Sequence, residues 1–330
     1  MPEALIIGAG PAGLAAALQL KRRGIDFRLF ERQRVGGLLN NANWVENYPG
    51  FPGGISGEAL VERFHQQVTE LGVEIAYEEV LNLDYAAGQF QAETAQGIYQ
   101  APVAIIASGT LGNTPEGVVT PPALRERVLT EILSIKQMAN QRVVIIGAGD
   151  LAFDYALNLG RSNQVLILNR SNELKCLPLL WERAGRLPAI QYHAQTHLAG
   201  IQAREDGGLS LLIESPSGGQ SITCDYLVYA IGRRPNNGFI SAPLLPVIGE
   251  LEKRGKLYSI GDVKNGIYRQ AAIAVARPHA RDPGRRSRPG AGSHRTRPAP
   301  PPDASSGRSP PRRPPLRSPG PIRPRSSCRA

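Results

Sequence analysis

Two stretches of the chain repeat the same order of apolar and polar positions. Each opens with a short, mostly apolar run, at Ala4–Ile7 and at Arg142–Ile146, and continues into a glycine-rich turn and a helical pattern. A short continuous apolar run bounded by glycines is typical of a strand that is buried on both faces of a parallel sheet. The repetition predicts two α/β domains of similar construction.

The first glycine turn, GAGPAG, stands where a dinucleotide would need it. Gly8 is expected to make the tight turn, Gly10 to let the backbone approach a pyrophosphate, and Gly13 to let the next helix lie close to the sheet. Pro11 and Ala12 open that helix, whose N-terminal amides and dipole favour phosphate. This segment therefore predicts a dinucleotide site.

The residues that follow complete the pattern. The helix is expected to run through Leu14–Leu20 and to stop near Gly24, and a second strand, Phe27–Phe30, ends in Glu31. A carboxylate at this place can accept a hydrogen bond from a ribose 2′-hydroxyl and repels a 2′-phosphate. A 2′-phosphorylated nucleotide is disfavoured at this first site.

The second turn, GAGDLA, keeps Gly147 and Gly149, adds Asp150, and has Ala152 in place of the third glycine. After the strand Val165–Leu168 the position of the acidic residue is taken by a neutral one. This difference changes the nucleotide that the second site prefers.

Asn169, Arg170 and Lys175 follow that strand, so no carboxylate repels a 2′-phosphate and two cations are available to pair with it. The sequence favours NADPH over NADH here. The alternative is that Arg170 is a solvated surface charge, as most arginines after a strand are.

Four further motifs occur in a fixed order. They are VGGLLNNANWVENYPGF at Val35–Phe51, AIIASG at Ala104–Gly109, IGRRP at Ile231–Pro235 and YSIGD at Tyr258–Asp262. Together with the two glycine turns, this set resembles the thioredoxin-reductase-like group of pyridine-nucleotide:flavin oxidoreductases. The resemblance covers residues 1 to about 276.

The resemblance implies an α/β fold with two Rossmann-like domains. Residues 1–112 and 239–276 would form a discontinuous FAD domain, into which an NAD(P)H domain, 113–238, is inserted. Within the insert, Leu198–Arg204, Leu209–Glu214 and Ile222–Ile231 are expected to be strands joined by hairpin turns.

The resemblance also assigns contacts to FAD. Glu31 would bind the adenosine ribose, Gly36 and Gly37 would lie beside the phosphates, and Asn47 would lie near the flavin. Asp262 would bind the ribityl or pyrophosphate portion, or be a helix N-cap, or both. Further contacts are assigned to Leu38, Val80, Ala107, Gly109, Gly261, Arg269, Gln270 and Ala271.

Cysteine usage limits where the electrons go next. Thioredoxin reductases carry a CxxC pair in the second domain, whereas this chain has only Cys176, Cys224 and Cys328, with none between Gly109 and Gly147. A dithiol relay is therefore not expected, and inert thiols are favoured at Cys176 and Cys224. Electrons would leave the flavin directly for an external acceptor, as in ferredoxin or flavodoxin NADP reductases. The alternative is a catalytically defective nucleotide-binding or sensing protein.

The segment 277–330 has a different composition, with 14 Arg and 14 Pro against two Asp, so it accounts for the net charge of +10. Such a segment predicts disorder. Three interpretations are open for this segment: a polycation for nucleic acid or an anionic membrane, a solvated Pro-rich extension, and out-of-frame translation. The last is favoured because the composition changes inside a helix. The dipeptide Arg277-Pro278 would cut that helix, so weakened FAD affinity is expected.

Other features set bounds on location and partners. Few cysteines and no basic leader predict a cytoplasmic protein without a membrane segment, and the resemblance leaves a homodimer open. His193 and His197 are four residues apart, but no cysteine or carboxylate beside them completes a metal site, so no metal is expected. The expected partners are FAD, NADPH, and a small molecule or an electron-carrier protein, with nucleic acid only if the basic tail is genuine.

Overall fold

The computed structural model describes residues 1–276, all of which belong to one compact unit. The predictions made for 277–330, including disorder and a break at Arg277-Pro278, lie outside the described residues. Among the helices that are described, none is both long and apolar enough to cross a bilayer.

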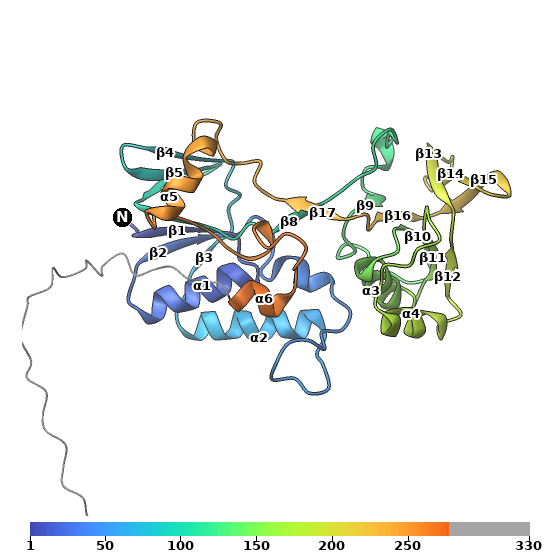
Figure 1. Cartoon of the computed structure of the whole chain (residues 1–330), viewed down its shortest axis with the longest axis horizontal. Helices are drawn as coiled ribbons and strands as arrows, with labels where there is room; N and C mark the ends of the chain where they lie inside the picture. The colour runs from blue at the N-terminus through green and yellow to red at the C-terminus, as the bar shows by residue number, and fades with distance from the viewer. Residues whose placement is uncertain (277–330) are drawn as a thin grey trace, which may run out of the picture. The chain divides into compact units, whose positions relative to one another are not determined.

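The first sheet is parallel and has five strands in the order β18-β7-β1-β2-β3 (Figure 1). The central strand carries the first glycine turn at its carboxyl end, and it pairs in register on both sides, Ala4 with Phe27 and Val103. The strands are β1 (Ala4–Ile7), β2 (Phe27–Phe30), β3 (Ile75–Ala76), β7 (Val103–Ile106) and β18 (Leu257–Ser259).

Both faces of this sheet are covered, which explains why its strands β1 and β7 are apolar and buried at every position. Alternate side chains point to opposite cores: Ile6 packs under the helices, whereas Leu5 packs under an antiparallel sheet. The helices on one face are α1 (Pro11–Arg22), α2 (Gly57–Glu70) and α6 (Ala271–Ala276). The other face carries β4 (Asn82–Ala86), β5 (Gln89–Thr94), β6 (Gly97–Ala101) and α5 (Ile248–Lys253). We call this part the first domain.

The second sheet repeats the plan, with the order β12-β11-β10-β16-β9 and the second glycine turn after its central strand. The strands are β9 (Val128–Leu129), β10 (Arg142–Ile146), β11 (Gln164–Leu168), β12 (Ile190–His193) and β16 (Tyr226–Tyr229). Helices α3 (Asp150–Leu159) and α4 (Pro178–Gly185) cover one face, and β13 (His197–Ala203), β14 (Leu209–Ser215) and β15 (Gly218–Cys224) cover the other. We call this part the second domain.

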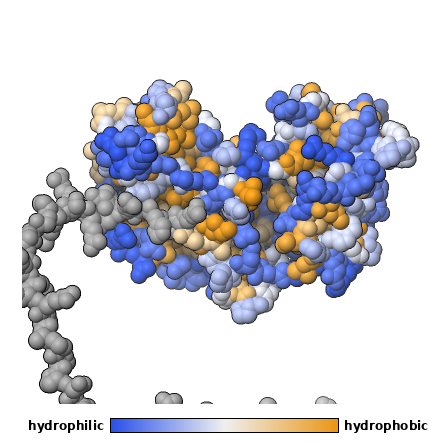
Figure 2. Space-filling view, in the orientation of Figure 1, coloured by the Kyte–Doolittle hydropathy of each residue, from blue (hydrophilic) through white to orange (hydrophobic). Residues whose placement is uncertain are grey.

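The chain passes between the two domains twice, as the antiparallel pair β8 (Thr110–Gly112) and β17 (Arg233–Pro235). Short 3₁₀ turns complete the fold at η1 (Gly37–Asn41), η2 (Pro122–Leu124), η3 (Leu245–Val247) and η4 (Gly261–Val263). On the face drawn in Figure 2, small groups of apolar side chains are scattered among polar ones. Scattered apolar groups of this kind are ordinary for a folded surface.

The fold confirms the α/β prediction with two Rossmann-like parallel sheets. One predicted element was wrong, because Ile222–Ile231 is not a single strand. It divides at Asp225, whose carboxylate accepts hydrogen bonds from the backbone and side chain of Arg142. There the chain leaves the antiparallel sheet at Cys224 and enters the parallel sheet at Tyr226. The predicted stop of α1 is confirmed: the helix ends at Arg22, and Gly24 has a φ of 69°.

Candidate functional site

The first glycine turn is closely packed on one side and open on the other. A Cβ on Gly8 would lie 2.6 Å from the carbonyl oxygen of Ala107, and one on Gly13 would lie 1.8 Å from that of Gly8. A Cβ on Gly10, in contrast, would meet nothing within 4 Å. The turn therefore holds its shape through backbone contacts and presents Gly10 to open space, where a pyrophosphate can approach.

Residues from two other segments come close to this turn. Gly36 donates its amide to the carbonyl oxygen of Ala9 at 2.8 Å, and a Cβ on Gly37 would lie 3.7 Å from Cα of Gly10. A Cβ on Gly261 would lie 2.6 Å from Cβ of Ala12 on α1. The structure thus brings three predicted contacts, from two segments far apart in sequence, to the carboxyl end of β1.

The carboxylate of Glu31 stabilises the first glycine turn through a hydrogen bond. Its side chain is buried, with 8% of the residue exposed. One carboxylate oxygen accepts the amide of Ala9 at 2.9 Å, and the other accepts those of Gln33 and Arg34 at 3.0 and 3.3 Å. Because each oxygen has two lone pairs, acceptor capacity remains for a ribose hydroxyl. The contact with ribose stays a prediction.

Asp262 is a candidate for direct contact with a ligand. Its Oδ1 is buried and has no hydrogen-bond partner among the described residues. Burial raises the pKa of this carboxyl, and the charges of Arg269 and Arg233 act in the opposite direction. Asp262 is not the N-cap of η4, a position held by Ile260. A buried carboxylate oxygen without a partner, in a turn that contacts α1, fits a hydroxyl-bearing cofactor.

Arg269 and Gln270 lie at the start of α6. One guanidinium nitrogen of Arg269 donates to the carbonyl oxygen of Arg233 at 2.9 Å, while its Nε is buried without a partner among the described residues. The carbonyl oxygen of Gln270 accepts the amide of Ala274, which places Ala271 in the first turn of the helix. These residues converge on the same region as Asp262, through contacts with η4.

The remaining residues predicted to contact FAD differ in how exposed they are. Gly109, with a φ of 67°, accepts the amide of Asn236, and Leu38 is half-buried in η1. Val80 is buried in the core beneath the first sheet, whereas Asn47 is exposed. The flavin roles of these four residues stay predictions.

The second glycine turn has the same geometry as the first. Gly147 has a φ of 130°, and a Cβ there would lie 2.3 Å from the carbonyl oxygen of Ala230, whereas Gly149 faces open space. Asp150 begins α3, and its carboxylate accepts the amide of Leu177 at 2.7 Å. Lys175 donates its amide to the carbonyl oxygen of Ala148 at 3.0 Å, so the loop after β11 folds over the turn.

Asn169 shapes that loop from within. It is buried, its amide group donates to the carbonyl oxygen of Glu173 and to the hydroxyl of Tyr192, both at 2.9 Å, and its oxygen accepts the amide of Ser171. An aspartate could not donate either of the first two hydrogen bonds. Asn169 therefore has a structural role besides the predicted one.

The two predicted cations of the loop differ. Arg170 is exposed and makes no hydrogen bond or ion pair with any other described residue. Lys175 forms an exposed ion pair with Glu173 at 3.5 Å. Arg170 is thus the cation in this loop whose charge is fully available to an anionic ligand.

The cysteines are separated. Cys224 is buried beneath the second sheet, and burial raises the pKa of its thiol to about 12. Cys176 packs on the opposite side of that sheet, and burial raises its pKa as well. Both are free thiols in apolar surroundings, which makes them poor nucleophiles. His193 and His197 lie on strands, and His197 pairs with Glu214 at 3.2 Å.

Sequence reasoning missed a set of polar contacts between the two domains. We call it the interdomain seam. It joins the loop after η1 and the start of α2 to α3, α4 and the segment that precedes β10. Its members are Asn40, Asn41, Asn43, Glu46 and Glu58 on the first domain and Glu131, Ile132, Lys136, Asp154, Asn158, Arg161 and Arg183 on the second. No local signal could reveal it, because the partners are about 80 to 140 residues apart.

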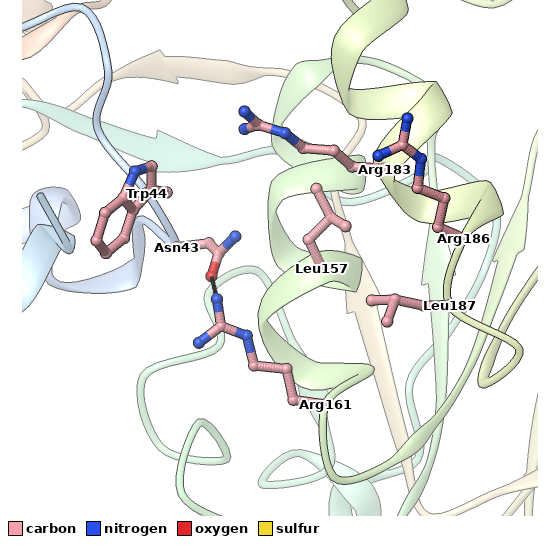
Figure 3. Close-up of a pocket in the computed structure, with 7 residues that line it drawn as sticks. All are labelled: Asn43, Trp44, Leu157, Arg161, Arg183, Arg186 and Leu187. Atoms are coloured by element: carbon pink, nitrogen blue, oxygen red, sulfur yellow. Dashed lines mark hydrogen bonds between the residues drawn. The ribbon is translucent and has the colours of Figure 1, made fainter. Parts of the chain in front are cut away.

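A pocket of about 400 Å³ lies in this seam (Figure 3). Asn43 and Trp44 face Leu157 and Arg161 of the α3 region and Arg183 of α4 across it. Arg161 donates to the side-chain oxygen of Asn43 at 2.9 Å, and Arg183 binds Glu46 with two hydrogen bonds of 2.7 and 2.8 Å. These guanidinium groups already have protein partners, so they serve to join the domains.

The fold and the two turns define a class of protein: an oxidoreductase with one cleft for a flavin dinucleotide and a second for a pyridine nucleotide. Residues 2–277 match the family described as pyridine nucleotide-disulphide oxidoreductase, and the chain belongs to that family. It is an FAD-dependent oxidoreductase whose cofactors are FAD and NADPH.

Several similar proteins support membership of this family. The thioredoxin reductase of Rickettsia typhi is 30% identical, covering 83% of this chain and 94% of the relative. The ferredoxin–NADP reductase of Ignicoccus hospitalis is 32% identical, covering 71% and 78%. Among solved structures, thioredoxin reductase of Lactococcus lactis in the FR conformation superposes with a TM-score of 0.73 at 25% identity, covering 85% of this chain and 96% of that one.

Proposed function

We propose that this protein transfers reducing equivalents from NADPH through FAD to an external acceptor without a dithiol relay. The observation that carries the proposal is the placement of Cys176 and Cys224 on opposite sides of the second sheet, each with a raised pKa. Neither thiol has a cysteine partner among the described residues. A disulfide that is alternately formed and reduced is therefore not available from this pair.

In this proposal the chain's own residues bind, orient and shield the nucleotides. Gly10 and the α1 N-terminus would hold the FAD pyrophosphate, with Glu31 on the ribose and Asp262 on the ribityl portion. Gly149 would hold the NADPH pyrophosphate, and Arg170 its 2′-phosphate. When bound, FAD supplies hydride acceptance and storage of two electrons.

We further propose that the acceptor is an electron-carrier protein of the ferredoxin or flavodoxin type. The support is the relative from I. hospitalis, which is named as a ferredoxin–NADP reductase and shares 32% identity with this chain. The separate positions of the described cysteines also favour such an acceptor over thioredoxin.

Anaerobic mixing tests the proposal directly. The purified chain, reconstituted with FAD, is mixed with NADPH while the flavin absorbance is recorded, and then ferredoxin, flavodoxin, a quinone or thioredoxin is added in separate experiments. We expect bleaching by NADPH and recovery of colour with a carrier protein, but no thioredoxin reduction. Efficient reduction of a thioredoxin would contradict the proposal.

A double variant, Cys176→Ser with Cys224→Ala, provides the matched control. Because neither thiol takes part, the rate of electron transfer to the acceptor should stay within about twofold of the parent, once folding is confirmed by thermal unfolding. A loss of more than tenfold in acceptor reduction, with bleaching by NADPH intact, would reveal a thiol step after all.

A second candidate is a nucleotide-binding or sensing protein without catalysis. It is favoured by one finding, that the family match ends at residue 277, where the Arg- and Pro-rich composition begins. The same mixing experiment separates the two: NADPH binding without bleaching supports the sensing protein. We predict weaker FAD retention than in a variant whose apolar helix continues beyond Ala276.

The organisation into 1–112, 113–238 and 239–276 is proposed with this function, because β18 returns to the first sheet after the second sheet is complete. A cytoplasmic location and a homodimer belong to the same proposal. Sedimentation of the reconstituted protein at several concentrations tests the dimer.

A further inference from the structure

Asp154 occupies an unusual position in the interdomain seam. It lies in the middle of α3 and points away from the second domain toward the loop after η1, where its Oδ2 accepts the backbone amide of Asn43 at 3.0 Å. No ion pair within the described part of the chain involves Asp154. Asp154 is half-buried, and a carboxylate taken partly out of water is costly unless a cation compensates it.

The charged groups around Asp154 do not provide that compensation. Lys136 is the nearest favourable charge, but its ammonium group donates to the carbonyl oxygen of Asn40 at 2.9 Å and pairs with Glu58 at 3.3 Å. Asp150, one turn earlier on α3, acts unfavourably. Arg161 and Arg183 are engaged with Asn43 and Glu46.

This environment acts on the proton affinity of the Asp154 carboxyl. Burial raises the pKa of the Asp154 carboxyl to about 6, while the backbone amides of Asn43 and Trp44 and the charge of Lys136 act against that rise. An aspartate in water has a pKa near 4. The proton is therefore bound more tightly when the seam is closed than when the carboxyl is exposed to water.

We propose that Asp154 is the positioning residue that controls the closure of the interdomain seam: its neutral form favours contact between the domains, and its ionised form favours their separation. The two strands β8 and β17 are the covalent connection between the domains, and domains joined in this way move relative to one another unless their interface is large. A residue that changes the free energy of the seam therefore changes how often the domains separate.

The sign follows from linkage. Well below pH 4 the carboxyl is neutral in both arrangements, so a further fall in pH no longer changes the balance between them. As the pH rises toward 6, the separated arrangement loses its proton first, so the equilibrium moves toward separation. Above about pH 6 both arrangements are ionised, and the shift levels off at about 100-fold, from the difference between the two pKa values. At neutral pH the seam is thus much looser than it would be with an uncharged side chain.

Trp44 offers a direct measurement, because it lines the pocket in the seam and is 44% exposed while the seam is closed. The chain has two tryptophans, so Trp181→Phe leaves Trp44 as the single fluorophore. Quenching of Trp44 by acrylamide, a neutral quencher, is measured on the full-length FAD-loaded protein from pH 4.5 to 7.5. Asp154→Asn keeps an acceptor oxygen for Asn43 but removes the titration.

We expect quenching in the parent to rise between about pH 4.5 and 6.5 and then to level off. Asp154→Asn should keep the low quenching of the closed seam at all these pH values. Asp26→Asn, which removes an exposed carboxylate outside the seam, should follow the parent. The proposal is overturned if the parent shows no rise, or if Asp154→Asn shows the same rise, because a group other than Asp154 would then be responsible.

Lys136→Gln provides an independent test if the asparagine variant folds poorly. Removing this charge raises the pKa of Asp154 in the closed seam further, so the rise in quenching should continue to a higher pH than in the parent. A rise that ends at the same or a lower pH contradicts the assignment to Asp154. None of these measurements needs NADPH or an acceptor, so their outcome is distinguishable from that of the proposed function.

Discussion

Gly13 and Gly8 are in such close contact that a methyl group on Gly13 would lie 1.8 Å from the carbonyl oxygen of Gly8. This contact presses the first turn of α1 against the end of β1. The helix N-terminus is thereby fixed at the carboxyl edge of the sheet, with Gly10 facing open space. The geometry of the first nucleotide cleft depends on the absence of one side chain.

Gly13→Ala is therefore expected to damage the fold itself. The overlap involves backbone atoms, which cannot rotate away as a flexible side chain would, so α1 must shift from the sheet at a cost of about 3 kcal/mol. Thermal unfolding without added FAD should show the loss. An apoprotein of unchanged stability would contradict this account of the turn.

Gly10→Ala is the matched variant with the opposite expectation. Gly10 has a φ of −71°, which alanine adopts easily, and its Cβ would meet nothing within 4 Å in the protein. The apoprotein should lose no more than about 1 kcal/mol, the usual cost of alanine at a helix N-cap. FAD affinity should fall at least about tenfold, because the new methyl group occupies the space of the pyrophosphate. Titration of apoprotein with FAD, followed by flavin fluorescence, measures it.

The elements that the sequence predicted well are those whose signal is local. The strands before the two glycine turns and the end of α1 near Gly24 depend on neighbours within a few residues. The split at Asp225 was missed because its partner, Arg142, is 83 residues away. In the sequence alone, an apolar run shows the same residue pattern whether its strand stays in one sheet or passes to another.

The interdomain seam could not be predicted for the same reason. Asn41 holds the backbone amide of Ile132 at 2.9 Å, and Lys136 reaches Asn40 and Glu58. Each of these residues is ordinary in its own segment. Their importance arises only when two domains lie against each other, and the sequence carries no pattern for that arrangement.

Asp262→Asn should separate the stability of the apoprotein from its affinity for FAD. Burial raises the pKa of this carboxyl, so the folded apoprotein holds its proton more tightly than the unfolded chain. The stability contribution is therefore fully present at acidic pH and is lost as the pH rises through the raised pKa. An asparagine avoids that loss, so the apo variant should unfold at a higher temperature than the parent at pH 8 but not at pH 4.

With FAD the order of the two proteins should reverse. Replacing a charged acceptor by a neutral one removes about 1.5 kcal/mol from a hydrogen bond to a ribityl hydroxyl, which is about tenfold in affinity. Thermal unfolding with and without FAD at pH 8 gives both results in one experiment. If FAD binds the variant and the parent equally, Asp262 has no role at the cofactor.

Arg170→Ala should erode the preference for NADPH. Arg170 is exposed, has no partner among the described residues, and lies in the loop that folds over the second glycine turn. A guanidinium that pairs with a 2′-phosphate contributes about 1.5 to 3 kcal/mol, so KM for NADPH should rise at least about tenfold. KM for NADH, which lacks that phosphate, should stay within about twofold. Arg125→Ala removes another exposed arginine from the segment assigned to the same domain and should change neither value. An equal rise in KM for both nucleotides would show that Arg170 shapes the loop and does not bind the 2′-phosphate of NADPH.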